Sequence, residues 1–425
     1  MRVPRILYID GDCFFASCEM ALEPKLRDRP VFVGGGRTGD GIVIAANYPA
    51  KRRGITTGMA CFEARRICPD GVLCPPQYNE YRRLSLEMFR RLRQYTPLLV
   101  PFSIDEGCLD FDQMPRVFHA RNAEDLAKRI KREIRKEVGI PLTMGIACSP
   151  RVAKLAAELN KPDGFKEVPP DGEAEFLKNV PIDELTGVGY RRMAALHALR
   201  MRSFGDIARA DRRILLKRFG ILGMELWMIA NGLFREPLVC ERKPRTCISN
   251  FTTLPVDEPD YERALLFLET QVEKVITTFF RENLKAHEMS VFVRFNDFSH
   301  RSRAVRFTQP LYIPSAIQPF VEQMFHDLVC QEQLPVRQVG VSFWNFVPLN
   351  LERDLFGDPP EVRLRELHYA LEKIEARFGR DAVMSARRLQ MIESTPYLAR
   401  EKAKCPFTPQ REMQLKLDKI PEVVY

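Results

Sequence analysis

Short apolar runs alternate with amphipathic stretches over roughly the first 165 residues, and this alternation predicts a layered α/β region. Ile6–Ile9, Leu98–Ile104 and Leu142–Ala147 have the length and apolar character of buried strands. Gln77–Tyr95 and Ala123–Val138 place apolar residues every three or four positions, which is the spacing of a helix with one buried face. We therefore expect a small sheet packed against helices.

The pattern changes twice further along the chain. Residues 166–240 contain short helical stretches, whereas a basic, linker-like stretch begins near residue 241. After it come a helix with one apolar face, an alternating strand at Met289–Phe295, a second apolar helix near Phe320–Val329 and a strand at Val339–Phe346. We expect two further domains, one helical and one of mixed α/β structure.

Three acidic residues stand beside the apolar runs of the first region. Asp10 directly follows Ile6–Ile9, and the pair Asp105 and Glu106 directly follows Leu98–Ile104. Carboxylates beside a sheet core need a cation or a partner, and two divalent ions bridged by carboxylates can stabilise the attacking and leaving oxygens of a phosphoryl transfer. Taken alone, the same residues could instead cap a turn or a helix, or mark a hairpin tip.

Composition narrows the range of partners. The 425 residues carry a formal net charge of +9, which suits a polyanion such as nucleic acid. No apolar run approaches the roughly 18 residues of a membrane span, and the N-terminus lacks a signal sequence, so we expect a cytoplasmic protein with no membrane partner. The eleven cysteines form no Cys-x-x-Cys pair, so we expect neither a zinc site nor a disulfide framework.

Five segments in consistent order and spacing carry a family resemblance: Asp10–Glu19, Ala46–Gly54, Ser103–Asp110, Asn160–Gly164 and Thr186–Gly189. With them the chain, from residue 1 to about residue 348, resembles a Y-family (lesion-bypass) DNA polymerase of the DinB or DNA polymerase IV type. The resemblance implies an α+β multidomain fold shaped as a right hand. Its parts would be a ferredoxin-like α/β palm (1–20 and 78–165), small fingers (21–77), a helical thumb with a helix-hairpin-helix (166–240), an α/β little finger (241–348) and a C-terminal tail (349–425).

The resemblance assigns the acidic residues to catalysis. Asp10, Asp105 and Glu106 match the three metal-binding carboxylates, and Gly11 matches the position that adds a backbone carbonyl ligand. This implies two Mg²⁺ ions per active site, with Mn²⁺ as a substitute, because such hard cations prefer oxygen ligands. Asp12 matches no ligand position, and we expect it to serve as a turn or helix-cap residue.

The nucleotide site follows from the same resemblance. Phe15 matches the steric gate, an aromatic ring that excludes the ribose 2′-hydroxyl by overlap. Its neighbour Phe14 is also expected at the dNTP, although two adjacent aromatics could both belong to the core.

A set of phosphate-binding residues completes that site: Tyr48, Lys51, Arg52 and Lys161. The position usually filled by Arg is Lys51, so either Lys51 binds the triphosphate or Arg52 reaches it from one position later. A third interpretation makes this basic run a solvated helix start.

Two further regions are expected to bind DNA. Gly187 and Gly189 match the turn of a helix-hairpin-helix, whose backbone N–H groups bind phosphate, although an ordinary helical hairpin would use the same glycines. Arg200 departs from the motif, which usually has Gly there. Arg301 and Arg303 are expected on the DNA-gripping sheet of the little finger, unless they are simply solvated.

The tail contains a candidate protein-binding peptide at residues 352–356. It looks like the segment that docks bacterial polymerases on the sliding clamp, with Leu355 and Phe356 as the apolar anchor, although Glu352 replaces the usual Gln. The alternative is that Leu355 and Phe356 pack back onto the chain itself.

The expected function is template-directed DNA synthesis past lesions, by a monomer that adds dNTPs to the 3′ end of a primer on primer-template DNA. Low fidelity is implied by small fingers, and about 75 residues outside the four domains are too few for a proofreading exonuclease. The main alternative is a catalytically inactive, polymerase-like adaptor in DNA repair, and a nucleotidyl cyclase and a plain DNA-binding protein are further rivals. The presence of all three acidic residues favours a catalytically active enzyme.

Overall fold

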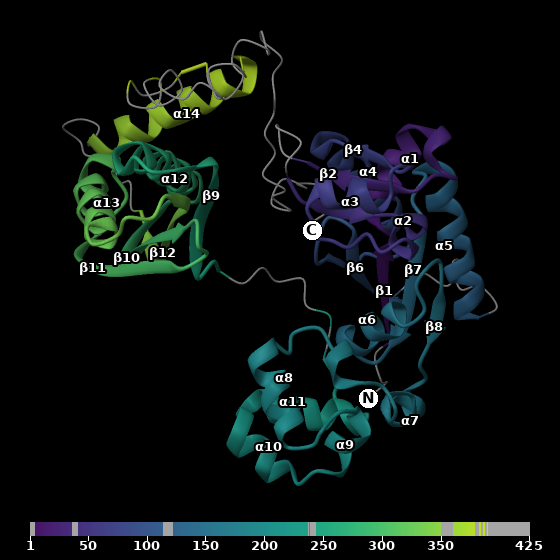
Figure 1. Ribbon diagram of the computed structural model, residues 1–425. Helices are drawn as coiled ribbons and strands as arrows, with labels where there is room; N and C mark the ends of the chain where they lie inside the picture. Colours follow the sequence, from purple (N-terminus) through teal and green to yellow (C-terminus); the bar gives the residue numbers. More distant parts are fainter. Residues whose placement is uncertain are drawn as a thin grey trace. The chain divides into compact units, whose positions relative to one another are not determined.

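The computed structural model describes residues 5–35, 41–113, 122–236, 238, 244–349 and 360–378, together with 382, 383, 386 and 389. These residues fall into two compact units that divide at residue 241 (Figure 1). The sequence pattern also predicts that the second α/β domain begins near residue 241. None of the described helices is both long enough and apolar enough to cross a bilayer.

A five-stranded sheet forms the centre of the first unit, in the order β5-β6-β1-β7-β8. Its strands are β1 (Ile6–Gly11), β5 (Leu99–Pro101), β6 (Glu106–Asp110), β7 (Leu142–Ala147) and β8 (Phe165–Glu167). The three predicted strands are confirmed, although the one predicted at 98–104 ends at residue 101 and a turn separates it from β6. The sheet continues to Glu167, two residues past the expected end of this domain at residue 165.

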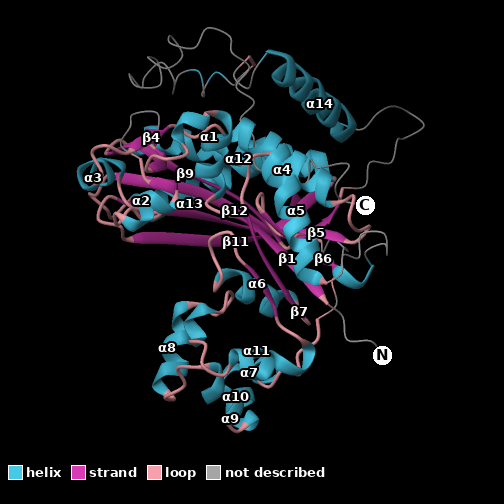
Figure 2. Cartoon of the chain, turned by 90° about the vertical axis from the view of Figure 1, so that its right-hand side faces the viewer, coloured by secondary structure: helices cyan, strands magenta, loops and turns pink. Residues whose placement is uncertain are grey.

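Helices cover both faces of this sheet (Figure 2). α1 (Phe14–Leu22), α4 (Tyr78–Leu92) and α5 (Ala123–Glu137) pack on one face, whereas α6 (Pro150–Glu158) packs on the other. Alternation along β1 divides the residues between the two cores: Leu7 and Ile9 join the first, and Ile6 and Tyr8 join the second. A short 3₁₀ helix, η2 (Phe111–Gln113), follows β6.

A smaller three-stranded sheet occupies the range expected for the fingers. Its strands β2 (Val31–Gly34), β3 (Val43–Ala46) and β4 (Val72–Cys74) lie in the order β3-β2-β4, and η1 (Pro24–Leu26), α2 (Tyr48–Arg52) and α3 (Cys61–Ile67) complete the region. The Asn47 side chain accepts hydrogen bonds from Ala50 N (3.1 Å) and Val31 N (3.0 Å). This buried amide both caps α2 and fixes it to β2.

Short helices make up residues 170–230: η4 (Pro170–Gly172), α7 (Glu173–Leu177), η5 (Ile182–Glu184), α8 (Tyr190–Ala198), α9 (Phe204–Arg209), α10 (Arg212–Phe219) and α11 (Ile221–Ala230). They share one core with α6. Glu173, which is 1% exposed, accepts hydrogen bonds from Cys148 N (2.8 Å) and Arg235 Nη1 (2.9 Å). This carboxylate anchors the helical region to the end of β7.

The second unit is a four-stranded antiparallel sheet with the order β11-β10-β12-β9. Its elements are β9 (Cys247–Glu258), α12 (Tyr261–Glu282), β10 (Leu284–Phe295), β11 (His300–Leu311), α13 (Pro314–Val329) and β12 (Val336–Pro348), followed by α14 (Pro360–Phe378). The two helices and two strands predicted for this region are confirmed, and β9 and β11 are additional.

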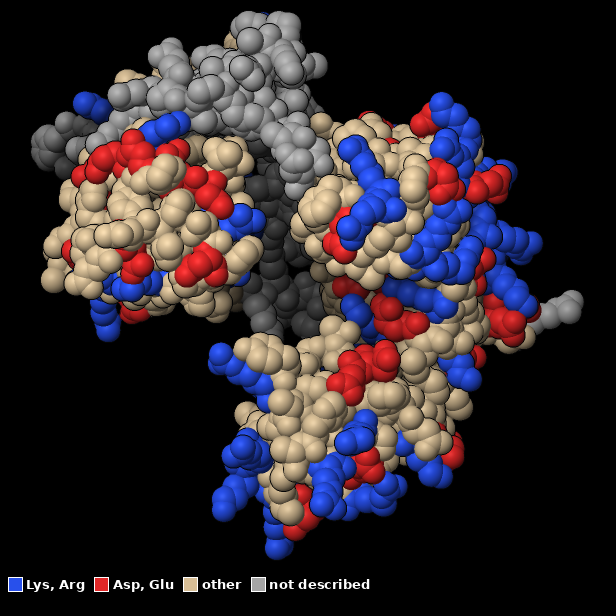
Figure 3. Space-filling view, viewed as in Figure 1, with Lys and Arg blue, Asp and Glu red and all other residues tan. Residues whose placement is uncertain are grey.

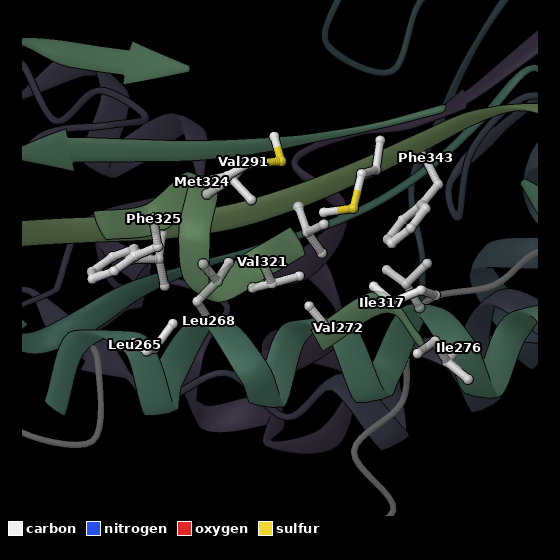
Figure 4. Packing of buried hydrophobic residues seen from close by; sticks show 14 of the residues in the cluster. Leu265, Leu268, Val272, Ile276, Val291, Ile317, Val321, Met324, Phe325 and Phe343 are labelled. Carbon is white, nitrogen blue, oxygen red and sulfur yellow. The ribbon is translucent and has the colours of Figure 1, made fainter. Parts of the chain in front are cut away.

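The core of this unit lies between the sheet and α12 with α13 (Figure 4). Leu265, Leu268 and Val272 point from α12 toward Val291 and Phe343 of the sheet. The predicted apolar face of α12 is therefore buried as expected, and the helix ends where Asn283 takes a left-handed conformation with φ of 52°.

Candidate active site

A cavity of about 390 Å³ lies where the two sheets of the first unit meet α1. Its walls are Asp10, Gly11, Cys13, Phe14, Phe15, Ile44, Ala45, Ala46, Lys51, Thr57, Ser103, Asp105, Glu106 and Lys161. All the residues predicted for the metal and nucleotide sites line it except Tyr48 and Arg52. Segments more than one hundred residues apart in the sequence therefore converge on one place.

The three acidic residues reach the cavity from the centre of the five-stranded sheet. Asp10 of β1 stands directly opposite Glu106 of β6, so both side chains lie on the same face. Asp105 occupies the turn just before β6, and Gly11 N donates a hydrogen bond to its carbonyl (2.9 Å). Asp105 and Glu106 thus lie where β6 starts, whereas the sequence pattern placed them at the end of the preceding strand. A Cβ at Gly11 would meet the Phe14 ring at 3.1 Å, so this position favours Gly.

Burial raises the free-energy cost of ionising these carboxylates. Asp10 is 7% exposed, and burial raises its pKa to about 6, although the Lys161 ammonium 2.7 Å from Asp10 Oδ1 acts in the opposite direction. Burial also raises the pKa of Asp105, which the Ser103 hydroxyl contacts. Carboxylates in this setting need a positive partner in order to remain ionised at neutral pH.

Two residues that the sequence analysis missed complete this arrangement. Lys154 of α6 places its Nζ 2.6 Å from Glu106 Oε2, and the buried Tyr8 hydroxyl donates to Glu106 and to Asp10 (3.2 Å for the latter). Tyr8 could have been found, because residues i and i+2 of a strand share a face. Lys154 gives only a weak signal, a single cation between the buried residues Ala153 and Leu155.

The donor chemistry fits hard divalent cations, although the side chains are not arranged around one. Within the described ranges, no three acidic, His or Cys groups are close enough together to hold a metal ion as they stand. Asp10 and Glu106 instead pair with the ammonium groups of Lys161 and Lys154. Carboxylate oxygens beside a backbone carbonyl are the ligands that Mg²⁺ prefers, and each ammonium stands in for a cation that these carboxylates require.

Phe14 and Phe15 both line the cavity, but they are held differently. Phe14 is 4% exposed and belongs to the core between α1 and the sheet. Phe15 is only partly buried, and its ring stacks on Tyr81 with centroids 4.8 Å apart and planes 23° apart. The Tyr81 hydroxyl donates to the buried Glu19, so the surface behind Phe15 is fixed.

Lys51 and Arg52 at the end of α2 are both exposed, but only Lys51 lines the cavity. Lys51 lines the cavity, and its Nζ lies 5.1 Å from the centre of the Tyr48 ring. Arg52 is exposed and is not among the lining residues. Tyr48 does not line the cavity either, but its hydroxyl donates to Asp12 Oδ1 at 3.4 Å.

Asp12 lies in the turn between β1 and α1, as expected, but it does not cap the helix. The N-cap of α1 is Cys13, which makes no side-chain capping bond. The Asp12 carboxylate is 2% exposed and accepts hydrogen bonds from Asp163 N (2.7 Å) and Thr143 Oγ1 (2.8 Å). It therefore joins α1 to β7 and to the loop that carries Lys161.

The predicted helix-hairpin-helix has a short first half. Only the single 3₁₀ turn η5 precedes Gly187, which has φ of 98°, and Gly189, the N-cap of α8. Arg200 itself adopts the left-handed conformation, with φ of 60°, that the usual Gly would take without strain. On the face seen in Figure 3, many basic and some acidic side chains lie over this helical region. The exposed basic residues of the region include Arg191, Arg192, Arg202, Arg213, Lys217 and Arg218.

Arg301 and Arg303 lie on the helix-covered side of the second unit's sheet. They stand opposite Val293 and Val291, which are buried in the core, so their side chains point the same way. Arg301 pairs with Glu332, and Arg303 pairs with Asp327 of α13. This placement does not support the expected contact of both arginines with DNA, which stays a prediction.

The open face carries different residues. Phe251 and Phe292 contact edge to face with ring centroids 5.5 Å apart, and a Cβ on Gly340 would overlap the Phe251 ring. Arg306 and Arg294 stand on the same face, because they pair across the strands with Glu288 and His300. The clamp-like residues Leu355 and Phe356 lie outside the described residues.

Comparison with known proteins gives consistent matches along most of the chain. The model of the impB/mucB/samB family matches residues 9–158, and that of the impB/mucB/samB family C-terminal domain matches residues 245–353. The DNA polymerase IV of Pelotomaculum thermopropionicum is 33% identical over 390 residues, which cover 91% of this chain and 95% of that protein. The DNA polymerase IV of Caulobacter vibrioides is 32% identical, covering 91% and 94%.

Solved structures agree with these matches. A Y-family DNA polymerase chimera of Dbh and Dpo4 aligns with a TM-score of 0.70 at 26% identity, over 81% of this chain and 99% of that one. An insertion ternary complex of Dbh DNA polymerase aligns with a TM-score of 0.54 at 26% identity, over 81% of this chain and 100% of that one.

Proposed function

Because this chain belongs to the impB/mucB/samB family and to the DNA polymerase IV type of Y-family polymerases, we propose that the cavity of its first unit is the site of nucleotide addition. The chain is a DNA-directed DNA polymerase of the translesion class, and its substrates are primer-template DNA and dNTPs. The observation that supports this location is the convergence of Asp10, Glu106 and Lys161 with the Phe15 ring around one cavity.

Asp10, Asp105 and Glu106, with the carbonyl of Gly11, would hold two Mg²⁺ ions, which Mn²⁺ can replace. When bound, such ions stabilise the attacking and leaving oxygens of an in-line phosphoryl transfer. Lys161 and Lys154 already compensate the carboxylate charge, at 2.7 Å from Asp10 and 2.6 Å from Glu106. We infer that Lys161 exchanges this contact for a phosphate oxygen of the incoming dNTP.

The remaining cavity residues would select and hold the nucleotide. Phe15 is the proposed steric gate, because its ring stands at the cavity wall with Tyr81 fixed behind it. Lys51 is the proposed triphosphate ligand of the basic run, because it lines the cavity whereas Arg52 does not. Tyr48 would contribute its hydroxyl, which is oriented by Asp12.

Incorporation of a single dNTP on a primed oligonucleotide tests the proposal. We expect Asp105→Ala and Glu106→Ala to lower kcat by at least roughly a thousandfold, since each removes a ligand used in the transition state, while DNA affinity stays within a few fold. Asp112→Asn is a matched control, because Asp112 pairs with Arg5 outside the cavity. Substantial synthesis by Asp105→Ala would contradict the assignment, and the inactive-adaptor alternative predicts no template-dependent synthesis by the unaltered protein.

The tail supports a second, separable proposal, that residues 352–356 dock the enzyme on the bacterial sliding clamp, where it works as a monomer on nucleoid DNA in the cytoplasm. Leu355 and Phe356 would fill an apolar pocket, and tethering would raise the effective concentration of enzyme at the primer. Replacing both with Ala should leave basal extension intact and abolish stimulation by the clamp of the source organism. Undiminished stimulation would rule out the peptide.

A further inference from the structure

Asp12 is a buried carboxylate with no place in the metal or nucleotide site described above, yet its partners come from both sides of that site. Its Oδ2 accepts the backbone N–H of Asp163 (2.7 Å), two residues after Lys161. Its Oδ1 accepts the hydroxyl of Thr143 (2.8 Å) and, more weakly, that of Tyr48 (3.4 Å). The Asp12 side chain thus contacts the loop that carries Lys161, which leads into the large sheet, and the start of α2, which follows a strand of the small sheet.

The loop between α6 and β8 is held at further points. Gly164 N donates to Thr143 Oγ1 (3.3 Å), so Thr143 links Asp12 to the end of the loop. On the outer side, the Asp163 carboxylate pairs with Lys131 Nζ (2.9 Å) and Arg135 Nη2 (2.8 Å) of α5. Asp163 has φ of 52°, a left-handed conformation that Asp and Asn tolerate better than most residues. The inner acceptors are buried, with Asp12 2% and Thr143 0% exposed, whereas the Asp163 carboxylate of the outer pairs is 42% exposed.

We propose that Asp12 is a positioning residue for the incoming nucleotide, which holds the Lys161 loop and the Tyr48 hydroxyl at the distance required to bind one triphosphate together. The inference rests on the proposed function of the cavity. Asp12 itself does not line the cavity, so it acts through Lys161 and Tyr48 and not by contact with substrate.

The physical reason is that a hydrogen bond to a buried carboxylate fixes position more firmly than an ion pair to an exposed one. A buried carboxylate without donors is costly, so Asp12, which is 2% exposed, retains the Asp163 N–H and with it the loop. The pairs of the 42% exposed Asp163 carboxylate with Lys131 and Arg135 are weakened by solvent and salt. A displacement of about 1 Å in a substrate-positioning group is enough to cost roughly a hundredfold in rate.

Steady-state incorporation of one dNTP separates positioning from a merely structural role. We expect Asp12→Ala to raise the KM for dNTP by roughly 10- to 100-fold, with DNA affinity unchanged. A purely structural role would reduce the active fraction, and with it kcat, without moving KM. Asp12→Asn should restore most of the KM, because its amide can still accept from Asp163 N and donate to the two hydroxyl groups.

Asp163→Asn is the matched control. It removes the ion pairs with Lys131 and Arg135, but it keeps the backbone N–H that Asp12 accepts and a side chain that tolerates positive φ. We expect its KM to stay within about twofold of the unaltered enzyme. A KM rise in Asp163→Asn equal to that in Asp12→Ala would overturn the proposal, because the outer contacts would then position the loop.

Two further measurements keep the test decisive. If Asp12→Ala does not fold, Thr143→Val removes the hydroxyl that links Asp12 to Gly164 at nearly constant volume, and it should raise the KM several-fold. Affinity of dNTP for enzyme on a dideoxy-terminated primer should fall in parallel, without any chemical step. An unchanged KM and affinity in these variants would refute the role of Asp12, whereas absence of synthesis by the unaltered enzyme would refute the proposed function instead.

Discussion

The acidic residues of the cavity in the first unit converge on one partly buried site, whereas two arginines of the second unit form exposed ion pairs beside one helix. Asp10 and Glu106 face one cavity, and their partners, Lys161 and Lys154, come from a different part of the unit. In the second unit, Arg301 and Arg303 pair with acidic groups on the adjacent helix and its C-terminal end, and their side chains remain 52% and 54% exposed.

The difference lies in burial: the acidic groups of the cavity are buried or partly buried, whereas the ion pairs of the two arginines are exposed. Burying a carboxylate is costly, so a group such as Asp10, with its pKa raised to about 6 by burial, persists where a cation or substrate uses it. An exposed ion pair costs little and contributes about 0 to 1 kcal/mol. We therefore expect substitutions around the cavity to change catalysis, and substitutions of the paired arginines to change almost nothing.

After the metal-binding carboxylates, the largest effect should come from the Phe15 ring at the cavity wall. Phe15→Ala should raise the use of ribonucleotides relative to deoxyribonucleotides on the order of 100-fold or more, because the space of the 2′-hydroxyl is no longer occupied. Phe14→Ala should instead lower the free energy of unfolding by about 3 to 5 kcal/mol with little change in sugar selection, since Phe14 is 4% exposed. The ratio of kcat/KM for the two sugars and denaturant unfolding measure both effects, and exchanged outcomes would reverse the two roles.

A smaller effect should distinguish the two basic residues of α2. Lys51→Ala should raise the KM for dNTP by about tenfold, which is the loss of one charge-assisted hydrogen bond, with DNA affinity unchanged. Arg52→Ala serves as the adjacent control and should leave the KM within about twofold, because Arg52 does not line the cavity. A KM effect confined to Arg52→Ala would show that the contact lies one residue later.

The smallest effect should come from the second unit. Arg301→Ala and Arg303→Ala should leave the salt dependence of DNA affinity unchanged and alter the free energy of unfolding by at most about 1 kcal/mol each. Arg294→Ala or Arg306→Ala, on the open face, should lower the salt slope by about one per lost phosphate contact. DNA binding measured across a salt series tests this, and a reduced slope after Arg301→Ala would place that side chain at the DNA.

Local patterns were sufficient for most elements and for the residue types of the site. The apolar runs at β1 and β7, the amphipathic faces of α4, α5 and α12, and the acidic residues beside the strands all depend on neighbours within a few positions. The family resemblance then named Phe15, Lys51 and Lys161, and the structure brings all three to the cavity.

Only the tertiary structure decided which side chains are hydrogen-bond partners and which face of a sheet a residue occupies. Asp12 finds Thr143 and Asp163 at separations of 131 and 151 residues, and Lys154 reaches Glu106 across 48, so no local pattern could predict these bonds. The side of the sheet taken by Arg301 and Arg303 depends on the register of β11 against β10, in which a shift of one residue exchanges the two faces. The sequence by itself determined which chemical groups are present, whereas long-range pairing determined which of them are buried together, because the cost of burying a charge depends on the partners that surround it.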